Sequence, residues 1–330
     1  MYQPEVYGIA LLFMIVSMLC WGSWANTIKL CPGYRFQLFY WDYVIGLIVA
    51  ALFWGTTLGS FGGVGKSFFS DIANAGLHPV LLAITSGVIF NVANLLLVAA
   101  IDIAGLAVAF PIGIGLALVV GAIGSYVISP AGNPLLLFGG IALVAAAIVL
   151  DAVAYRLREA NRPAMSLRGI VISLIAGLLM GCFYPFISKA MTGEGALGPY
   201  AALLLFVTGV AACSIPVNYI LMRMPLDARE PAEMRGYWAA PANWHLWGVL
   251  GGAVWCTGAT MNFVASQAHI VGPAVSYSIG QGATMISACW GVFIWNEFAS
   301  APSRSRTALA WMFVFFLCGL TAIAVAPLFS

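Results

Sequence analysis

The sequence predicts an all-α integral membrane protein whose ten transmembrane helices form two inverted repeats of five. Composition, an internal repeat and the placement of basic residues predict this class. Of the 330 residues, 62% are apolar and 7% are charged, and the mean hydropathy is +1.00. Soluble domains carry about 25% charged residues, so this chain could not cover a surface facing water. The formal net charge of +2 gives no reason to expect a nucleic-acid partner.

A segment of the first half recurs in the second. Residues 105–115 (GLAVAFPIGIG) align with residues 272–282 (GPAVSYSIGQG), 167 positions later. A weaker similarity at an offset of 160 joins residues 21–29 to residues 181–189. A repeat of half a chain, built on membrane-length segments, is typical of transporters made of two related halves. We therefore expect one repeat in residues 1–160 and the other in residues 161–330, which together form one transport domain.

Ten apolar segments are long enough to cross a bilayer as helices of about 20 residues. They are residues 6–28, 37–59, 78–101, 103–128, 134–156, 169–190, 199–223, 246–268, 273–296 and 306–328. No basic region precedes the first segment, so we expect it to be a membrane helix and not a cleaved signal.

The basic residues predict the orientation. Eleven of the 13 Lys and Arg residues lie in the connections between segments 1 and 2, 5 and 6, 7 and 8, and 9 and 10. Basic connections stay in the cytoplasm, so both termini should lie on the extracytoplasmic side of the cell membrane. Five helices is an odd number, so the second half enters the bilayer from the opposite side. Inverted repeats place a substrate site near mid-membrane, between the halves.

Candidate site residues in the first half are aromatic, amide and acidic. Trp24 lies in segment 1, and Asn91 and Asn94 share one face of segment 3. Each of these has an alternative explanation: Trp24 as part of an interfacial aromatic belt, the two amides as hydrogen bonds between helices. Asp42 and Asp151 are the candidates for proton coupling, because an acid within an apolar span is costly and usually functional.

Ion pairs are the alternative role for the two acids. Asp42 lies near the start of segment 2 and could pair with Lys29 or Arg35. Asp151 lies about one turn before Arg156 and Arg158, a spacing that favours a local ion pair there. The proton role of Asp151 is therefore secondary to that of Asp42.

The second half offers its own candidates. Tyr184 aligns with Trp24, and Trp255 and Asn262 lie seven residues apart on one face of segment 8. Tyr277 and Gln281 lie on one face of segment 9, where they replace Phe110 and Ile114 of the first repeat. We expect these groups and those of the first half to surround one cavity at mid-depth. A ring-shaped solute would stack there on the aromatic rings and hydrogen-bond to the amides.

Several other chemistries are excluded. Residues 59–67 resemble a phosphate-binding loop, but the first glycine is one position too early and no strand precedes it. The three histidines are far apart and the seven cysteines include no C-x-x-C pair, so we expect no metal. No catalytic arrangement is visible, so we expect neither an enzyme nor a cofactor.

Four segments resemble the ureide permeases and their bacterial relatives in the drug/metabolite transporter superfamily. They are residues 19–27 (LCWGSWANT), 40–43 (YWDY), 87–95 (GVIFNVANL) and 290–298 (WGVFIWNEF). The resemblance implies the drug/metabolite transporter fold and proton-coupled uptake of small neutral heterocycles, such as ureides or nucleobases, across the inner or plasma membrane. The related rhamnose and glucose/ribose porters share the superfamily, so a sugar permease is one alternative. A broad-specificity exporter is the other.

Overall fold

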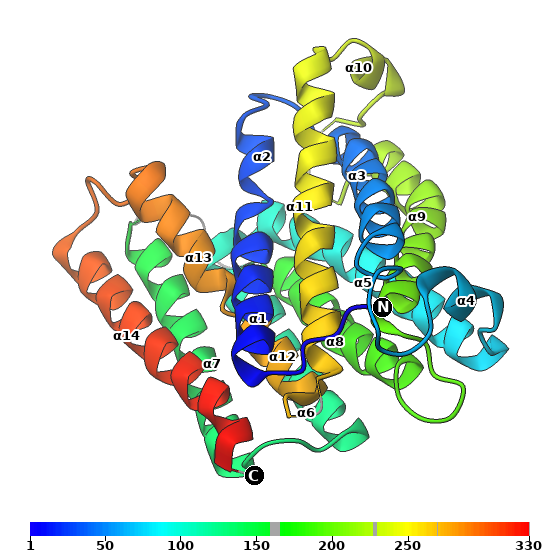
Figure 1. The fold of residues 1–330 in the computed structure, drawn as a ribbon. Helices are drawn as coiled ribbons and strands as arrows, with labels where there is room; N and C mark the ends of the chain where they lie inside the picture. Colours follow the sequence, from blue (N-terminus) through cyan, green and yellow to red (C-terminus); the bar gives the residue numbers. More distant parts are fainter. Residues whose placement is uncertain (159–165, 227–229, 269, 330) are drawn as a thin grey trace.

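The computed structural model describes residues 1–158, 166–226, 230–268 and 270–329. Every regular element within these ranges is a helix (Figure 1). In this part of the chain, nine helices are long and apolar enough to cross a membrane. The prediction of an all-helical, multi-pass membrane protein is therefore confirmed.

The predicted first half contains seven helical elements. They are α1 (Tyr7–Ser23), α2 (Asn26–Lys29), α3 (Phe36–Thr56), α4 (Phe68–Ala73), α5 (Leu77–Ala104), α6 (Leu106–Ile128) and α7 (Pro134–Arg158). The predicted second half contains nine. They are α8 (Leu167–Ala190), α9 (Pro199–Arg223), α10 (Met234–Trp238), α11 (Ala242–Ser266), α12 (Gly272–Gly280), α13 (Ala283–Cys289), η1 (Trp290–Ile294), α14 (Ser303–Val325) and η2 (Ala326–Phe329). The short helices α4 and α10 lie in connections, and α1 with α2 forms one span.

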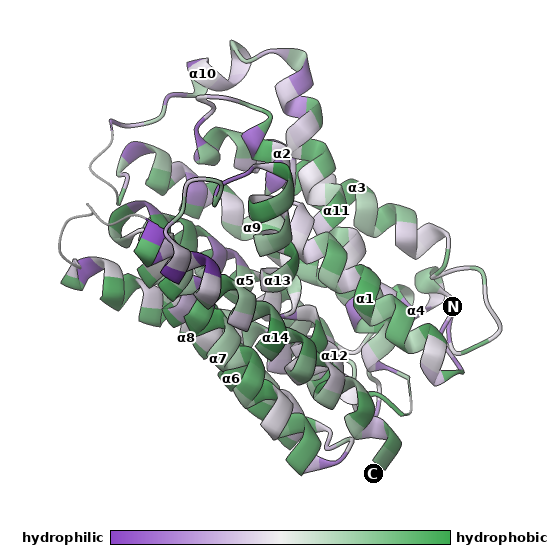
Figure 2. Ribbon diagram, turned by 90° about the vertical axis from the view of Figure 1, so that its left-hand side faces the viewer, coloured by the Kyte–Doolittle hydropathy of each residue, from purple (hydrophilic) through white to green (hydrophobic). Residues whose placement is uncertain are grey.

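The outer surface of the long helices is apolar. Leu12 of α1, Leu178 of α8 and Leu317 of α14 are each more than half exposed. Hydrophobic residues run along the helices, and hydrophilic ones gather mainly at helix ends and in connections (Figure 2). Exposed apolar faces of this extent are suited to lipid and not to water.

The prediction of one continuous helix over residues 273–296 is wrong. The segment is divided into α12, α13 and the π-helical turn η1, with Gln281 and Gly282 between the first two. Two glycines flank Gln281, and α1 packs against both: a Cβ on Gly280 would lie 2.6 Å from the Trp21 ring, and one on Gly282 would lie 2.5 Å from the Met18 sulfur. Glycine weakens the helix here. The apolar composition continues through the break, so hydropathy alone could not reveal it.

The first glycines of the two repeated segments have similar backbone conformations. Gly105, between α5 and α6, has φ of 81°, and Gly272, at the start of α12, has φ of 72°. Both values lie in the region that favours glycine. The aligned glycines therefore make equivalent turns into the fourth helical segment of each half.

The helices pack as two similar groups. In one group, α5 and α6 pack against α8; in the other, α11, α12 and α13 pack against α1. We call these the α8 group (α5, α6, α8) and the α1 group (α1, α11, α12, α13). Each group joins the first long helix of one half to the third and fourth segments of the other. The peripheral pairs α5–α9 and α11–α3 are likewise equivalent.

Glycines bring the peripheral pairs into backbone contact at equivalent places. A Cβ on Gly87 of α5 would lie 1.9 Å from the carbonyl oxygen of Phe206, and one on Gly252 of α11 would lie 1.9 Å from that of Tyr43. The same holds for a second pair of positions, Gly46 against Val249 at 2.0 Å and Gly209 against Ile84 at 2.1 Å. No side chain fits at any of the four positions without moving a backbone.

Candidate substrate-binding cavity

A cavity of about 360 Å³ lies between the α8 group and the α1 group. The ends of α2 and α3 complete its wall through Ile28 and Phe36. No acidic or basic side chain lines it among the described residues. Its polar side chains are Asn94, Gln281, Thr284 and Ser287, set among apolar and aromatic groups. A wall of this kind can hydrogen-bond an uncharged solute but offers no counter-charge to an ion.

Four of the predicted site residues line the cavity: Trp24, Asn94, Trp255 and Gln281. Asn94 on α5 donates from Nδ2 to the Tyr40 hydroxyl at 3.3 Å, and no described residue bonds its Oδ1. Gln281 lies in the break between α12 and α13, and its side-chain amide has no hydrogen-bond partner among the described residues. Both amides therefore keep hydrogen-bonding capacity for a solute.

The aromatic wall differs from the expected one. Trp255 is only 6% exposed because its ring packs against Phe90 at 4.5 Å and Trp21 at 5.8 Å between ring centroids. Trp24 remains partly exposed and meets Tyr43 at 4.9 Å. Trp24 is therefore better placed than Trp255 to stack on a ring-shaped solute.

The other four predicted site residues lie behind the wall. Tyr184 donates to Asn262 Oδ1 at 2.5 Å, and Tyr277 donates to the Ala117 carbonyl at 3.1 Å. The Oδ1 of Asn91 accepts from the Tyr40 hydroxyl at 2.8 Å. These four residues, Asn91, Tyr184, Asn262 and Tyr277, are all fully buried. Helical spacing places residues on a shared face but does not say whether that face meets a cavity or another helix.

Thr284 shares its predicted helix face with Gln281 but was not named as a site residue, and Ser287 was not singled out; both extend the polar stripe that begins at Gln281. The three residues follow one another at intervals of three, so they lie along one side of α13 and the turn before it. Extending that spacing from Gln281 along the sequence would have found them.

Neither predicted proton-coupling residue lines the cavity. Asp42 is almost completely buried and is bonded by Tyr237 at 2.6 Å and His245 at 2.8 Å. Its expected pairing with Lys29 or Arg35 is wrong, because Lys29 bonds Glu297 and Arg35 donates to the Glu230 carbonyl.

Asp151 is 5% exposed, and its Oδ1 has no hydrogen-bond partner. The expected ion pair with Arg158 is not formed, because that guanidinium bonds Glu297 at 3.1 Å. Among the described residues, Asp151 has no ion pair with Arg156 either. Within the described part of the chain, the acid therefore lies buried in α7 without a cationic partner.

Comparisons with known proteins agree with the resemblance seen in the sequence. Ureide permease 1 of Arabidopsis thaliana is 20% identical, and Ureide permease 2 of the same plant 22% identical, each over 98% of both chains. Over nearly its whole length, the chain is therefore similar to proteins named ureide permeases. Ureide permease 5 of the same plant is 22% identical over 96% of this chain and 93% of its own. No protein-family model matches the chain.

Solved structures share this fold. A protein crystal structure that is 14% identical superposes with a TM-score of 0.63, covering 94% of this chain and 95% of its own. At this identity the match shows a common fold alone. The permease relatives point to a transporter and not to an enzyme.

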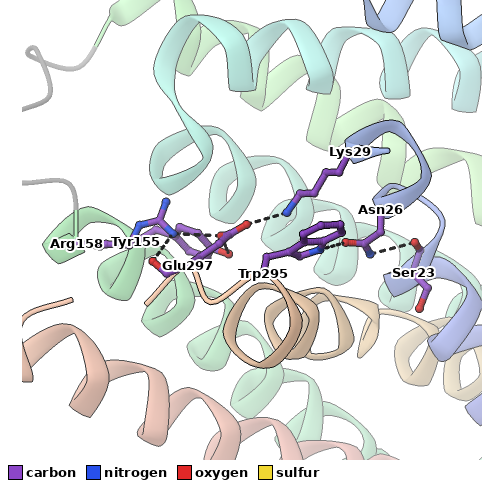
Figure 3. Close-up of polar contacts among 7 residues, drawn as sticks. All are labelled: Ser23, Asn26, Lys29, Tyr155, Arg158, Trp295 and Glu297. Atoms are coloured by element: carbon purple, nitrogen blue, oxygen red, sulfur yellow. Dashed lines mark hydrogen bonds and ion pairs between the residues drawn. The ribbon is translucent and has the colours of Figure 1, made fainter. Parts of the chain in front are cut away.

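Glu297 joins three helical segments beside the basic connections (Figure 3). Its carboxylate bonds Lys29 of α2 at 2.7 Å and, from α7, Arg158 at 3.1 Å and the Tyr155 hydroxyl at 3.2 Å. Next to it, Trp295 donates from Nε1 to Asn26 Oδ1 at 2.6 Å. The sequence does not reveal this role of Glu297, because Lys29 lies 268 positions away and no local pattern connects the two.

We expect Glu297→Gln to lower the thermal stability of the purified protein at neutral pH by about 1.5–3 kcal/mol, because hydrogen bonds to charged groups are lost. Glu297 lies outside the nine spans. Burial acts to raise its pKa, but the bonds from Lys29 and Arg158 outweigh burial and lower it. Because the pKa of Glu297 is lowered in the folded state, its ionised carboxylate stabilises the fold at any pH above the ordinary glutamate pKa of about 4.3. This stabilisation is lost as the pH falls through the pKa that Glu297 has in the folded protein.

The difference in melting temperature between wild type and Glu297→Gln should therefore shrink on acidification below about pH 4. Glu194→Gln is the control, because Glu194 is exposed and has no ion pair among the described residues. A melting temperature unchanged by Glu297→Gln at neutral pH would contradict a stabilising role for the cluster.

Proposed function

We propose that the protein is a secondary active transporter that takes up a small neutral polar solute, such as a ureide or nucleobase, together with protons. The observation that carries the proposal is the uncharged cavity between the two helix groups, with Asn94 and Gln281 on opposite sides. Ureides and nucleobases present N–H donors beside C=O acceptors, and amide side chains match both. The names of the relatives support this substrate class.

The cavity chemistry supports a neutral solute over an ion. Transfer of an unpaired charge into an apolar site is strongly unfavourable, and the described wall supplies no opposite charge. The partly exposed ring of Trp24 suits a flat heterocycle. The same features would accept a sugar ring, so sugars belong in the test.

Alternating access between two repeats, residues 1–160 and 161–330, is part of the proposal. The exchanged helix groups, the equivalent glycine contacts and the matching turns at Gly105 and Gly272 support a repeated architecture. In such transporters, one bundle rocks against the other around a central site. Here the cavity lies between the α8 group and the α1 group, where a relative movement would change its access.

Uptake into proteoliposomes tests the function. With an inward proton gradient, we expect labelled allantoin, uracil or xanthine to be concentrated, and ribose and glucose to be transported poorly. When a protonophore collapses the proton gradient, the solute should no longer be concentrated inside the vesicles, but the exchange of internal for external solute should continue. Concentration of a sugar alone would favour the sugar permease, and efflux of varied amphipathic compounds would favour the exporter. Transport of none of these solutes would contradict the proposal.

The orientation forms a further prediction. From the distribution of basic residues, we expect both termini outside the cytoplasm and α10 inside. Single cysteines replacing Arg235 in α10 or Asn74 after α4, in a chain whose native cysteines are changed to serine, report the side. An impermeant maleimide added to intact cells should label position 74 and not position 235, and the reverse result would invert the assignment.

A further inference from the structure

Asp42 is the acceptor in a small polar site outside the cavity. Its carboxylate is 3% exposed. Oδ2 lies 2.8 Å from His245 Nδ1, and Oδ1 accepts from the Tyr237 hydroxyl at 2.6 Å. The other titratable groups that face it are Tyr34 and Cys31, from the connection before α3. Among the described residues, no lysine or arginine pairs with this acid.

His245 connects this buried carboxylate to water. Its side chain is 26% exposed, against 3% for Asp42. Imidazole changes charge near neutral pH, which no other ordinary side chain does. An imidazolium can pass its Nδ1 proton to Asp42 Oδ2, which leaves a neutral imidazole and a neutral carboxylic acid. The imidazolium forms when a hydronium ion protonates Nε2 of the neutral ring, and the reverse sequence releases the proton from Asp42 to water.

The turn of α3 that carries Asp42 also contacts residues of the cavity wall. The residue after Asp42, Tyr43, packs against the Trp24 ring at 4.9 Å and stacks with Tyr40 at 5.1 Å. The Tyr40 hydroxyl accepts from Asn94 at 3.3 Å. Two cavity residues, Trp24 and Asn94, therefore touch the turn of α3 that carries Asp42.

The site also lies at a tight helix contact. Asp42 is on α3 and His245 is on α11, and a Cβ on Gly248 would lie 2.5 Å from the Asp42 Cβ. The α11 helix continues to Trp255 in the cavity wall. When the charges of Asp42 and His245 change, the strength of the hydrogen bond between α3 and α11 changes as well. Both helices reach the cavity, and a change in such a bond can favour one packing arrangement of the two helices over another.

We propose that Asp42 and His245 form the proton-exchange site of the transporter, in which His245 carries protons between water and the buried carboxylate. The proposal rests on the proton-coupled uptake proposed above and assigns the residues that perform the coupling. Tyr237 is a positioning residue, because its hydroxyl holds Oδ1 while Oδ2 faces the imidazole.

Two measurements test the assignment. In proteoliposomes under a gradient of one pH unit, a transporter that moves one proton with each solute can concentrate allantoin about tenfold at most. Asp42→Asn and His245→Gln should each reduce this accumulation of allantoin, by up to about tenfold. Exchange without a gradient should fall much less. His78→Gln is the matched control, because His78 is exposed at the start of α5. Wild-type accumulation by His245→Gln would overturn the assignment.

Infrared titration of purified protein provides a readout that does not depend on transport. The protonated-carboxyl band that disappears in Asp42→Asn should change in amplitude with pH in wild type, and the midpoint of that change should move in His245→Gln. An unmoved midpoint would overturn the inference. A wild-type protein that shows this titration but concentrates no solute would instead contradict the proposed function.

Discussion

Replacement of Gly87 or Gly252 by alanine should greatly reduce the yield of folded protein. The added Cβ would lie 1.9 Å from a backbone carbonyl oxygen in each case, so two packed helices would have to separate. Overpacking typically costs about 1–3 kcal/mol, and more when backbone must move, so we expect the upper end of this range or beyond. Size-exclusion yield and thermal unfolding in detergent measure the effect.

The two substitutions should have similar effects, because α5–α9 and α11–α3 are equivalent contacts in the proposed repeat. Gly139→Ala is the matched control, because a Cβ there meets no atom within 4 Å. That control should be neutral or slightly stabilising, since alanine favours a helix by about 1 kcal/mol over glycine. Wild-type stability in either Gly87→Ala or Gly252→Ala would contradict the close packing described for that pair.

Asn94→Ala and Gln281→Leu should each weaken substrate binding by about tenfold or more without loss of folded protein. Each removes an amide that faces the cavity, and a buried solute group left without its partner costs about 1–3 kcal/mol. Isothermal titration of purified protein with the transported solute measures the change. Wild-type affinity in both variants would mean that the amides only hold helices together.

Asn262→Ala provides the contrast. Asn262 was predicted as a site residue but bonds Tyr184, the Ser17 hydroxyl and the Ser276 carbonyl behind the wall. Its loss should lower the melting temperature, because those groups are left unpaired, while the folded fraction keeps its affinity. A tenfold loss of affinity with unchanged stability would place Asn262 in the site after all.

The long helices could be predicted because a membrane span needs a continuous apolar run, which the sequence displays directly. The break at Gln281 could not, because the glycines that flank it align with Gly113 and Gly115, which lie inside the unbroken helix α6. Asn91 and Asn94 share a helix face, yet only Asn94 lines the cavity. The Oδ1 of Asn91 is instead occupied by the hydroxyls of Tyr40 from α3 and Ser214 from α9, contacts that no local pattern reveals. The partners of Asp42 lie about 200 positions away, beyond any local pattern.

Among the described residues, the Glu297 cluster (Figure 3) has no counterpart around the aligned Lys189. Lys189, which aligns with Lys29, is exposed and forms no ion pair in the part of the chain that the structure describes. Any conformation that separates η1 from α7 must break the Arg158–Glu297 bond, and no equivalent bond compensates at Lys189. In the proposed transport cycle, a bond on one face alone cannot alter the final ratio of solute concentrations across the membrane, because the driving gradient sets that ratio. The bond can only change how long the protein stays open to one side. We therefore expect the solute concentration that gives half-maximal transport to differ between the two sides of the membrane.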